Sequence, residues 1–480
     1  MRIIIFGRIA QALLALLSLR IMTSLLSPEE VGRWSLLIAV TSFFAFGLIN
    51  PLGMFINRRL HEWVEEGRVN RYMSYYFVYL LAVSLLAAVM LYGVSLVYSF
   101  VPGMSLFWII GLVMCSIIFG TLNQTFIPSL NLLGYRGWFV LLMLATVGSS
   151  LLASVGIAFF LRAGAELWQV GQLIGQAGLA IIGAGLFFKV VIKQKKRKPV
   201  GQELSLNYKK VRVLFLFAWP LAIAVLLTWT QSQSYRFVGQ NSIGLESLGL
   251  FVIGYGLSAS LFGIFESVIC TYFLPLFYKR ISRGNKHEQA LAWANYATVM
   301  LPAVLIIVAA TASVSEELTQ ILLDKKFSSA AQFVVWGALA EAARVIVGTY
   351  ALLAHAGMDT KKLMLPNILG AISGPLLVFL FAPIWATHGV GLGLAVASFI
   401  AILSSHLFLS NSFEIIMPWV RLFWASILAL LFYCLFFVGH IVFGYGATLI
   451  SSVAWLMVAG LMMLLMLFFL LKGQLMTDPV

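Results

Sequence analysis

The sequence predicts an all-α polytopic membrane protein with about fourteen transmembrane helices, arranged as two pseudo-symmetric six-helix lobes plus two C-terminal helices. Three observations predict this fold class: a membrane-type composition, apolar runs along the whole chain, and two halves that resemble each other. Of the 480 residues, 61% are apolar and 10% are charged. A soluble domain of this length would need far more polar surface.

The apolar runs are long enough to cross a bilayer, which takes about 20 residues of helix. The links between them are too short to hold a soluble domain. An N-terminal run could be a signal peptide, but Arg8 interrupts it and no small-residue cleavage site follows, so we predict a retained first span. The predicted spans lie at roughly 3–27, 35–56, 72–99, 104–127, 139–161, 168–192, 211–235, 247–277, 289–312, 328–354, 363–383, 387–410, 419–440 and 446–471.

The basic residues are divided unevenly between the two sides of the membrane. With a cytoplasmic N-terminus, the cytoplasmic links carry 23 Lys and Arg residues and the opposite links carry five. The positive-inside rule therefore predicts that both termini are cytoplasmic. The net charge of +14 is interpreted as topology rather than nucleic-acid binding, and the run KQKKRK at Lys193–Lys198 as an anchor on anionic lipid.

The three cysteines, Cys115, Cys270 and Cys434, lie in apolar runs without the spacing of metal ligands or a disulfide framework. We therefore predict no metal site.

Two stretches on either side of the basic run match in order. PEEVGRWSLLIAV at Pro28–Val40 matches LESLGLFVIGYGL at Leu245–Leu257 with an offset of 217, and SLNLLGYRGW at Ser129–Trp138 matches LLAHAGMDTK at Leu352–Lys361 with an offset of 223. The alternative is that unrelated membrane hairpins look alike. The matches favour a six-helix lobe at 1–192, a basic cytoplasmic linker at 193–210, a second six-helix lobe at 211–410 and two additional helices at 411–480, an arrangement typical of transporters.

Ionisable and polar side chains within the spans are the best pointers to function, because a charge at the centre of a membrane helix costs roughly 2.5–3.5 kcal/mol. Arg20 shares a helix face with Ser24, and it lies 12 residues before Gly32 as Arg236 lies 13 before Gly249, so the two arginines are matched in the repeat. We predict that cations and polar groups line a substrate cavity; the candidates are Arg20, Ser24, Gln231, Ser232, Tyr235, Arg236, Arg344 and His355.

Two acidic residues within the spans are candidate sites for a coupling proton or Na⁺. Glu266 stands alone in LFGIFESVIC, and Glu341 lies three residues before Arg344 on a stripe that continues to His355. The alternatives are a structural carboxylate for Glu266 and a self-neutralising ion pair for Glu341.

Several stretches resemble Wzx-type polysaccharide flippases of the multidrug/oligosaccharidyl-lipid/polysaccharide exporter superfamily. They are SLLSPEEVGRWSLLIAVTSFFAFGL followed by INRRL, the central FAWPLAIAVLLTWTQSQSYRFVGQNSIGLESLGLFVIGYGLSASL, and the fourteen-span layout with its basic central link. The resemblance covers nearly the whole chain. It implies a two-lobed fold with a cationic central cavity. Relatives often carry an acid before the basic residue near the end of span 7, where this chain has Tyr235 before Arg236.

The resemblance also implies an activity and partners. Such proteins move undecaprenyl-diphosphate-linked oligosaccharides from the cytoplasmic to the periplasmic leaflet of the bacterial inner membrane, for O-antigen, lipopolysaccharide or exopolysaccharide. The implied partners are the lipid-linked oligosaccharide, membrane lipid, and polysaccharide polymerase and chain-length proteins, without nucleic acid, cofactor or covalent catalysis.

Two rival functions are weighed against this one. A drug or metabolite exporter of the same superfamily would favour a more acidic cavity, since cationic drugs need carboxylates. A membrane glycan polymerase or ligase would be an enzyme with a sizeable outer loop, whereas the links at 231–246 and 312–327 are short and lack an acid/base constellation.

Overall fold

The computed structural model describes residues 2–194, 208–281, 286–357, 359–443 and 448–475, and all regular structure in these ranges is helical. The chain is divided into two compact units, Met1–Trp229 (unit 1) and Thr230–Val480 (unit 2). Most of the predicted basic linker, from residue 195 to 207, lies outside the described residues. The predicted boundaries of the two repeated lobes remain a prediction. Residues 211–229, which were predicted to begin the second lobe, belong to unit 1 by their contacts.

Twelve stretches of the described chain are long and apolar enough to cross a membrane, so the protein is a multi-pass membrane protein. Two of them, Leu221–Ile281 and Lys361–Ser410, are 61 and 50 residues long, more than one crossing requires. Each contains a break in helical geometry, at Gly244 and at Trp385–Ala386. Both breaks fall between predicted spans. The total of fourteen crossings and the cytoplasmic placement of the termini remain predictions.

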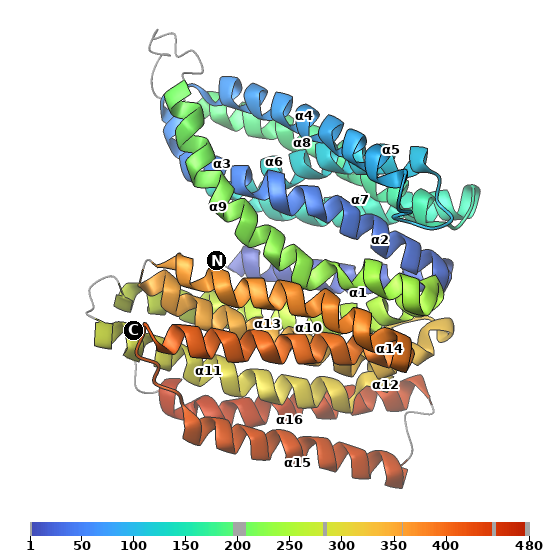
Figure 1. The fold of residues 1–480 in the computed structure, drawn as a ribbon, viewed down its shortest axis with the longest axis vertical. Helices are drawn as coiled ribbons and strands as arrows, with labels where there is room; N and C mark the ends of the chain where they lie inside the picture. Colours follow the sequence, from blue (N-terminus) through green and yellow to red (C-terminus); the bar gives the residue numbers. More distant parts are fainter. Residues whose placement is uncertain (1, 195–207, 282–285, 358, 444–447, 476–480) are drawn as a thin grey trace. The chain divides into compact units, whose positions relative to one another are not determined.

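Unit 1 is built from nine α-helices with two π-helical turns (Figure 1). Its elements are α1 (Arg2–Leu25), α2 (Pro28–Phe44), η1 (Ala45–Ile49), α3 (Asn50–Glu65), α4 (Val69–Ser95), α5 (Leu106–Cys115), η2 (Ser116–Gly120), α6 (Thr121–Leu132), α7 (Arg136–Phe160), α8 (Ala165–Gln194) and α9 (Tyr208–Gln233), the last of which ends in unit 2.

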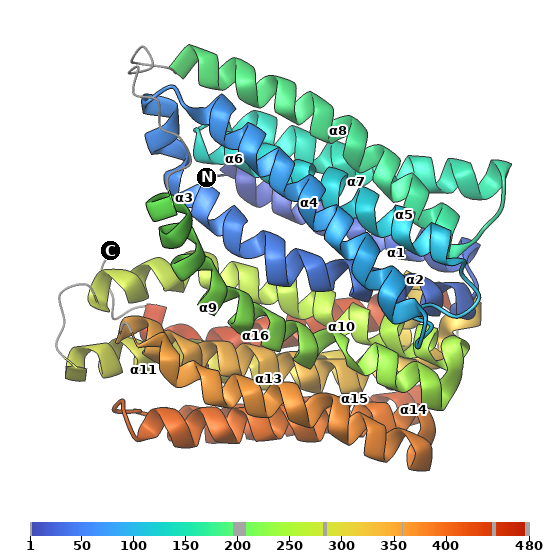
Figure 2. The same ribbon diagram turned by 45° about the horizontal axis from the view of Figure 1, so that its top comes forward.

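Helices α7 and α8 lie side by side, and they pack against each other more extensively than any other pair of described helices (Figures 1 and 2). Small residues face each other there: a Cβ added at Gly171 would lie 2.3 Å from Cα of Ser154, and one at Gly175 would lie 2.3 Å from N of Ser150. The two serine hydroxyls donate to backbone carbonyls of α8 across the contact. Such small residues, four apart on each helix, let membrane helices approach until their backbones touch.

The two π-helical turns interrupt the helices that run from α2 to α3 and from α5 to α6. A π-helical turn displaces the i→i−4 hydrogen-bond ladder and leaves backbone carbonyls available to other donors. In η1 the hydroxyl of Tyr79 on α4 donates to the carbonyl of Leu48 at 2.8 Å. In η2 the Ser116 hydroxyl lies 3.3 Å from Nε2 of Gln169, on α8.

Unit 2 surrounds the buried helix α11, which packs against α10, α13, α15 and α16. Figure 1 shows α11 running alongside α16. The unit's elements are α10 (Tyr235–Ile281), α11 (Lys286–Ser313), α12 (Ser315–Leu322), η3 (Lys325–Ala330), α13 (Ala331–Ala356), η4 (Thr360–Leu363), α14 (Met364–Ser410), α15 (Trp419–Phe443) and α16 (Leu449–Leu475).

The break in α14 is a reversal of direction. Ala386 has φ 48°, a left-handed conformation that is uncommon for a residue with a Cβ. Beyond it, Gly389 approaches the carbonyl of Phe381 and Gly393 approaches the backbone of Val378. The two halves of α14 therefore lie antiparallel against each other, as expected for two adjacent spans.

A buried acid and a buried histidine lie together where α12 meets α15. Oε1 of Glu317 on α12 lies 2.9 Å from Nε2 of His440 on α15, and both side chains are almost fully buried. The His440 ring also contacts Trp455 of α16. This contact connects α12 with α15, which also packs against α11.

Candidate functional site

In unit 1 the predicted polar face of α1 includes Arg20 and Ser24, and one donor of Arg20 has no acceptor among the described residues. The Ser24 hydroxyl donates to the carbonyl of Ile21 at 2.7 Å, and Ser27 accepts from N of Glu30 as the cap of α2. Nη1 of Arg20 is buried and donates to no atom of the residues that the structure describes. A buried donor without an acceptor is costly, so Arg20 stands out among the polar groups of α1.

In unit 2 the predicted pair Tyr235 and Arg236 begins α10. The Tyr235 ring is buried against Phe251 and Tyr255. The Arg236 guanidinium lies over the same ring, 5.7 Å from its centroid, and Nε is 3.4 Å from the Tyr235 hydroxyl. The tyrosine that replaces an acid here thus holds the arginine by a cation–π contact.

The polar residues that end α9 lie close to α14. Nε2 of Gln231 would be 2.8 Å from a Cβ added at Gly370, so the glycine lets this side chain lie close against α14. Ser232 is half-buried beside it in sequence. Oε1 of Gln233, which the sequence analysis did not single out, is buried and accepts no hydrogen bond within the described ranges.

The acids and arginine of unit 2 form one cluster, which we call the ion triad: Glu266, Glu341 and Arg344. Nε of Arg344 donates to Oε2 of Glu341 at 2.7 Å, and Nη2 donates to Oε2 of Glu266, also at 2.7 Å. The Tyr255 hydroxyl donates to Oε1 of Glu341 at 3.0 Å. The triad therefore links α10 to α13 in the middle of their membrane-spanning stretches.

The ion triad is partly accessible. The Arg344 and Glu266 side chains are 47% and 31% exposed, whereas Glu341 is 8% exposed. With both carboxylates ionised its net charge is −1. Charged groups in a membrane generally face a protein interior or a water-filled path rather than lipid.

His355 does not join the triad. It lies eleven residues beyond Arg344 on α13, in the last turn, which is about 16 Å along a helix. The structure thus brings Glu266, Glu341 and Arg344 together. His355, which was predicted on the same helix face as Glu341 and Arg344, lies apart from them.

Several polar contacts between the helices of unit 1 involve uncharged side chains. Nδ2 of Asn123 donates to Oγ1 of Thr146 and to the carbonyl of Gln176, both at 3.2 Å. Nε1 of Trp34 donates to Oε1 of Gln169 at 2.9 Å. These residues were not predicted as a group, because neutral polar side chains in membrane helices are too common to single out without knowing their neighbours.

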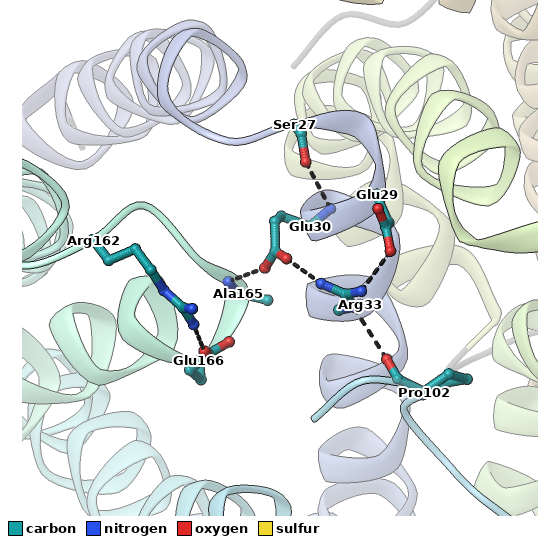
Figure 3. Close-up of polar contacts among 8 residues, drawn as sticks. All are labelled: Ser27, Glu29, Glu30, Arg33, Pro102, Arg162, Ala165 and Glu166. Atoms are coloured by element: carbon teal, nitrogen blue, oxygen red, sulfur yellow. Dashed lines mark hydrogen bonds and ion pairs between the residues drawn. The ribbon is translucent and has the colours of Figure 1, made fainter. Parts of the chain in front are cut away.

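Five charged residues of unit 1 gather where three inter-helix turns meet (Figure 3). We call Glu29, Glu30, Arg33, Arg162 and Glu166 the turn cluster. Arg33 pairs with Glu29 and Glu30 and donates to the carbonyl of Pro102 at 3.1 Å, and Arg162 pairs with Glu166. The amide of Ala165, which starts α8, donates to Oε2 of Glu30 at 2.7 Å. The cluster joins the α1–α2, α4–α5 and α7–α8 turns, a structural role.

No protein-family model matches the sequence, and no curated protein matches it. Solved structures do. A structure of the lipid II flippase MurJ in an inward closed conformation is similar with a TM-score of 0.65 at 13% identity, covering 98% of each chain. An inward-facing multidrug resistance transporter of the MATE family has a TM-score of 0.57 at 12% identity, covering 84% of this chain and 95% of that one.

A third similar structure is a MOP-superfamily transporter from Pyrococcus furiosus, described as having a binding pocket of reverse polarity that suggests a different function. Its TM-score is 0.56 at 12% identity, over 85% of this chain and 94% of that one. At these identities the likeness shows the fold alone. The chain has the fold of MOP-superfamily transporters, and the proteins that it resembles here are transporters rather than enzymes.

Proposed function

We propose that this protein is a Wzx-type flippase of the bacterial cytoplasmic membrane. It would move undecaprenyl-diphosphate-linked oligosaccharide from the cytoplasmic to the periplasmic leaflet, by alternating access, for surface polysaccharide synthesis. The transporter fold supports the general mechanism, and the sequence resemblance supports the substrate class.

The observation that carries the proposal is Nη1 of Arg20, which is buried without an acceptor among the described residues. The guanidinium stays charged at any working pH and can donate two parallel hydrogen bonds to a phosphate. Because Nη1 is buried and finds no acceptor in the described chain, an anionic head group would complete it. Arg236 and Arg344 are proposed as further head-group cations, and Ser24, Gln231, Ser232, Tyr235 and His355 as polar lining.

The test is replacement of Arg20 by Ala in the producing bacterium, with surface polysaccharide as the readout. We expect loss of most surface polysaccharide while the protein remains in the membrane at normal amounts, and partial retention with Arg20→Lys. Arg8→Ala is the matched control, because Arg8 lies on the same helix but is satisfied by Gln11 and by the Phe139 ring. Unchanged polysaccharide with Arg20→Ala would reject the proposal.

A second candidate function is export of an organic cation, as in the multidrug resistance transporters of similar fold. The observation that favours it is the net negative charge of the ion triad, which suits a cationic ligand. Sensitivity of a deletion strain to lipophilic cations, with normal surface polysaccharide, would support this function instead.

A further inference from the structure

Arg344, the arginine of the ion triad, has N–H donors that the two carboxylates do not engage. A guanidinium has five N–H donors in a planar fork. Nε of Arg344 is engaged by Glu341 and Nη2 by Glu266, while Nη1 makes no hydrogen bond to any described residue. The outer edge of the fork, Nη1 with Nη2, is the edge that binds two oxygens of a phosphate.

The two carboxylates that bind Arg344 differ in their burial and in their number of hydrogen-bond partners. Glu341 lies one turn away on the same helix, is buried, and is fixed from its other oxygen by the Tyr255 hydroxyl. Glu266 reaches across from α10, is 31% exposed, and makes one hydrogen bond, to Nη2 of Arg344. Glu266 is therefore the partner that a competing oxyanion can displace.

Displacement has a consequence for charge. A phosphate that binds the outer edge of the fork meets two carboxylates beside it, and like charges at this distance repel strongly away from bulk water. A proton on the released Glu266 removes one of the two negative charges. Binding of an anion at Arg344 is thereby linked to uptake of a proton.

Several titratable groups of the described residues near Glu266 and on the neighbouring helices already have partners. Glu341 is engaged twice, and Cys270 and Tyr296 contact each other at 3.4 Å. On α14, His388 contacts Trp336 and His406 contacts Tyr350. On η3, which meets α10 at Gly254, about 18 Å along the helix from Glu266, the charged groups are Lys325 and Lys326.

We infer that Glu266 is an exchangeable counter-ion. A phosphate of the substrate replaces its carboxylate on Nη2 of Arg344, and the released carboxylate takes one proton from the water phase. No covalent bond forms or breaks. This inference rests on the proposed function, since it requires an anionic head group, and it adds that head-group binding is coupled to a proton.

The test measures binding of farnesyl diphosphate to the purified full chain between pH 6 and pH 8. For the wild type, affinity should fall as pH rises, by up to about tenfold per pH unit relative to the variant Glu266→Gln. The ratio of the two dissociation constants cancels the titration of the probe itself. Glu246→Gln is the matched control, because it removes the same charge from an exposed position of α10 and should keep the wild-type slope.

A constant ratio across the pH range would overturn the exchange while leaving the flippase proposal intact. No binding by the wild type at any pH would reject both. If Glu266→Gln does not fold, Glu266→Ile removes the same carboxylate, and calorimetry of the wild type in two buffers of different ionisation enthalpy needs no variant. Uptake of about one proton per bound probe supports the exchange, and zero uptake overturns it.

Discussion

The two units differ in where some of their charged residues meet. Unit 1 has the turn cluster, in which ion pairs join three inter-helix turns. Unit 2 has ion pairs outside its α-helices too, such as Lys362 with Asp359, but it also has the ion triad, midway along α10 and α13. The turn cluster therefore stabilises turns, whereas the ion triad joins two long apolar helices and is partly exposed.

The predicted repeat pairs the turn cluster of unit 1 with uncharged residues of unit 2. At the predicted offset of 217, Glu30 and Arg33 correspond to Ser247 and Leu250. Conversely, Glu266 corresponds to Ile49, the last residue of the π-helical turn η1.

The second match behaves in the same way. At the offset of 223, Glu341 corresponds to Ile118, which lies inside the π-helical turn η2. By the predicted repeat, unit 1 therefore has a π-helical turn at both positions where unit 2 has an acid.

The largest expected effect comes from removing the arginine of the ion triad. Arg344→Met leaves two carboxylates facing each other without a cation. Removing one partner of a buried pair costs about 3–5 kcal/mol, and because the Arg344 side chain is 47% exposed we expect a loss at the lower end, about 3 kcal/mol. The thermal unfolding midpoint of the purified protein should fall accordingly. Unit 1 offers the comparison, because Asn123→Ala removes an uncharged polar group from between its helices and should cost about 1–3 kcal/mol.

A compensated variant separates charge imbalance from lost packing. In the triple variant Glu266→Gln, Glu341→Gln, Arg344→Met no charge remains, so most of the lost stability should return. If Arg344→Met alone is as stable as the wild type, the triad is not held together by its ion pairs and the contrast between the units loses its energetic basis.

A smaller effect is expected from filling a close contact between two helices, which each unit contains. Gly175→Val in unit 1 and Gly337→Val in unit 2 would each place a side chain less than 3 Å from the neighbouring helix, so we expect losses of about 1–3 kcal/mol in both. Gly178→Ala on α8 meets nothing within 4 Å and should be neutral. Unequal losses at Gly175 and Gly337 would contradict the view that the units are built alike and differ in charge placement.

Much of the framework could be predicted from the sequence, because apolar runs and their interruptions are local. Gly244 and Ala386, where α10 and α14 break, fall between predicted spans. The ion pair of Glu341 with Arg344 follows from their helical spacing. That Glu266 completes the triad could not be predicted, since it depends on how α10 packs against α13.

Other features had no signal in the sequence. The π-helical turns η1 and η2 occur in ordinary apolar runs, where no residue type marks a displaced hydrogen-bond ladder. His355 was grouped with Arg344 because helical spacing gives the face of a residue, but it does not limit the distance along the axis.

The smallest expected effect comes from giving unit 1 the residues that unit 2 has at the matched positions of its turn. The double variant Glu30→Ser, Arg33→Leu removes the pair with Glu29, the bond to the Pro102 carbonyl and the acceptor of the Ala165 amide. These groups lie near the surface, where water replaces lost partners, so we expect a loss of about 1–2 kcal/mol. Hydrogen exchange should rise in the first turn of α8 and in the α4–α5 turn while α10 and α13 are unaffected. The control Glu246→Gln should leave exchange unchanged in unit 1. If hydrogen exchange rises equally in both units, the turn cluster does not stabilise its own turns alone. The comparison of the two units at these positions would then be wrong.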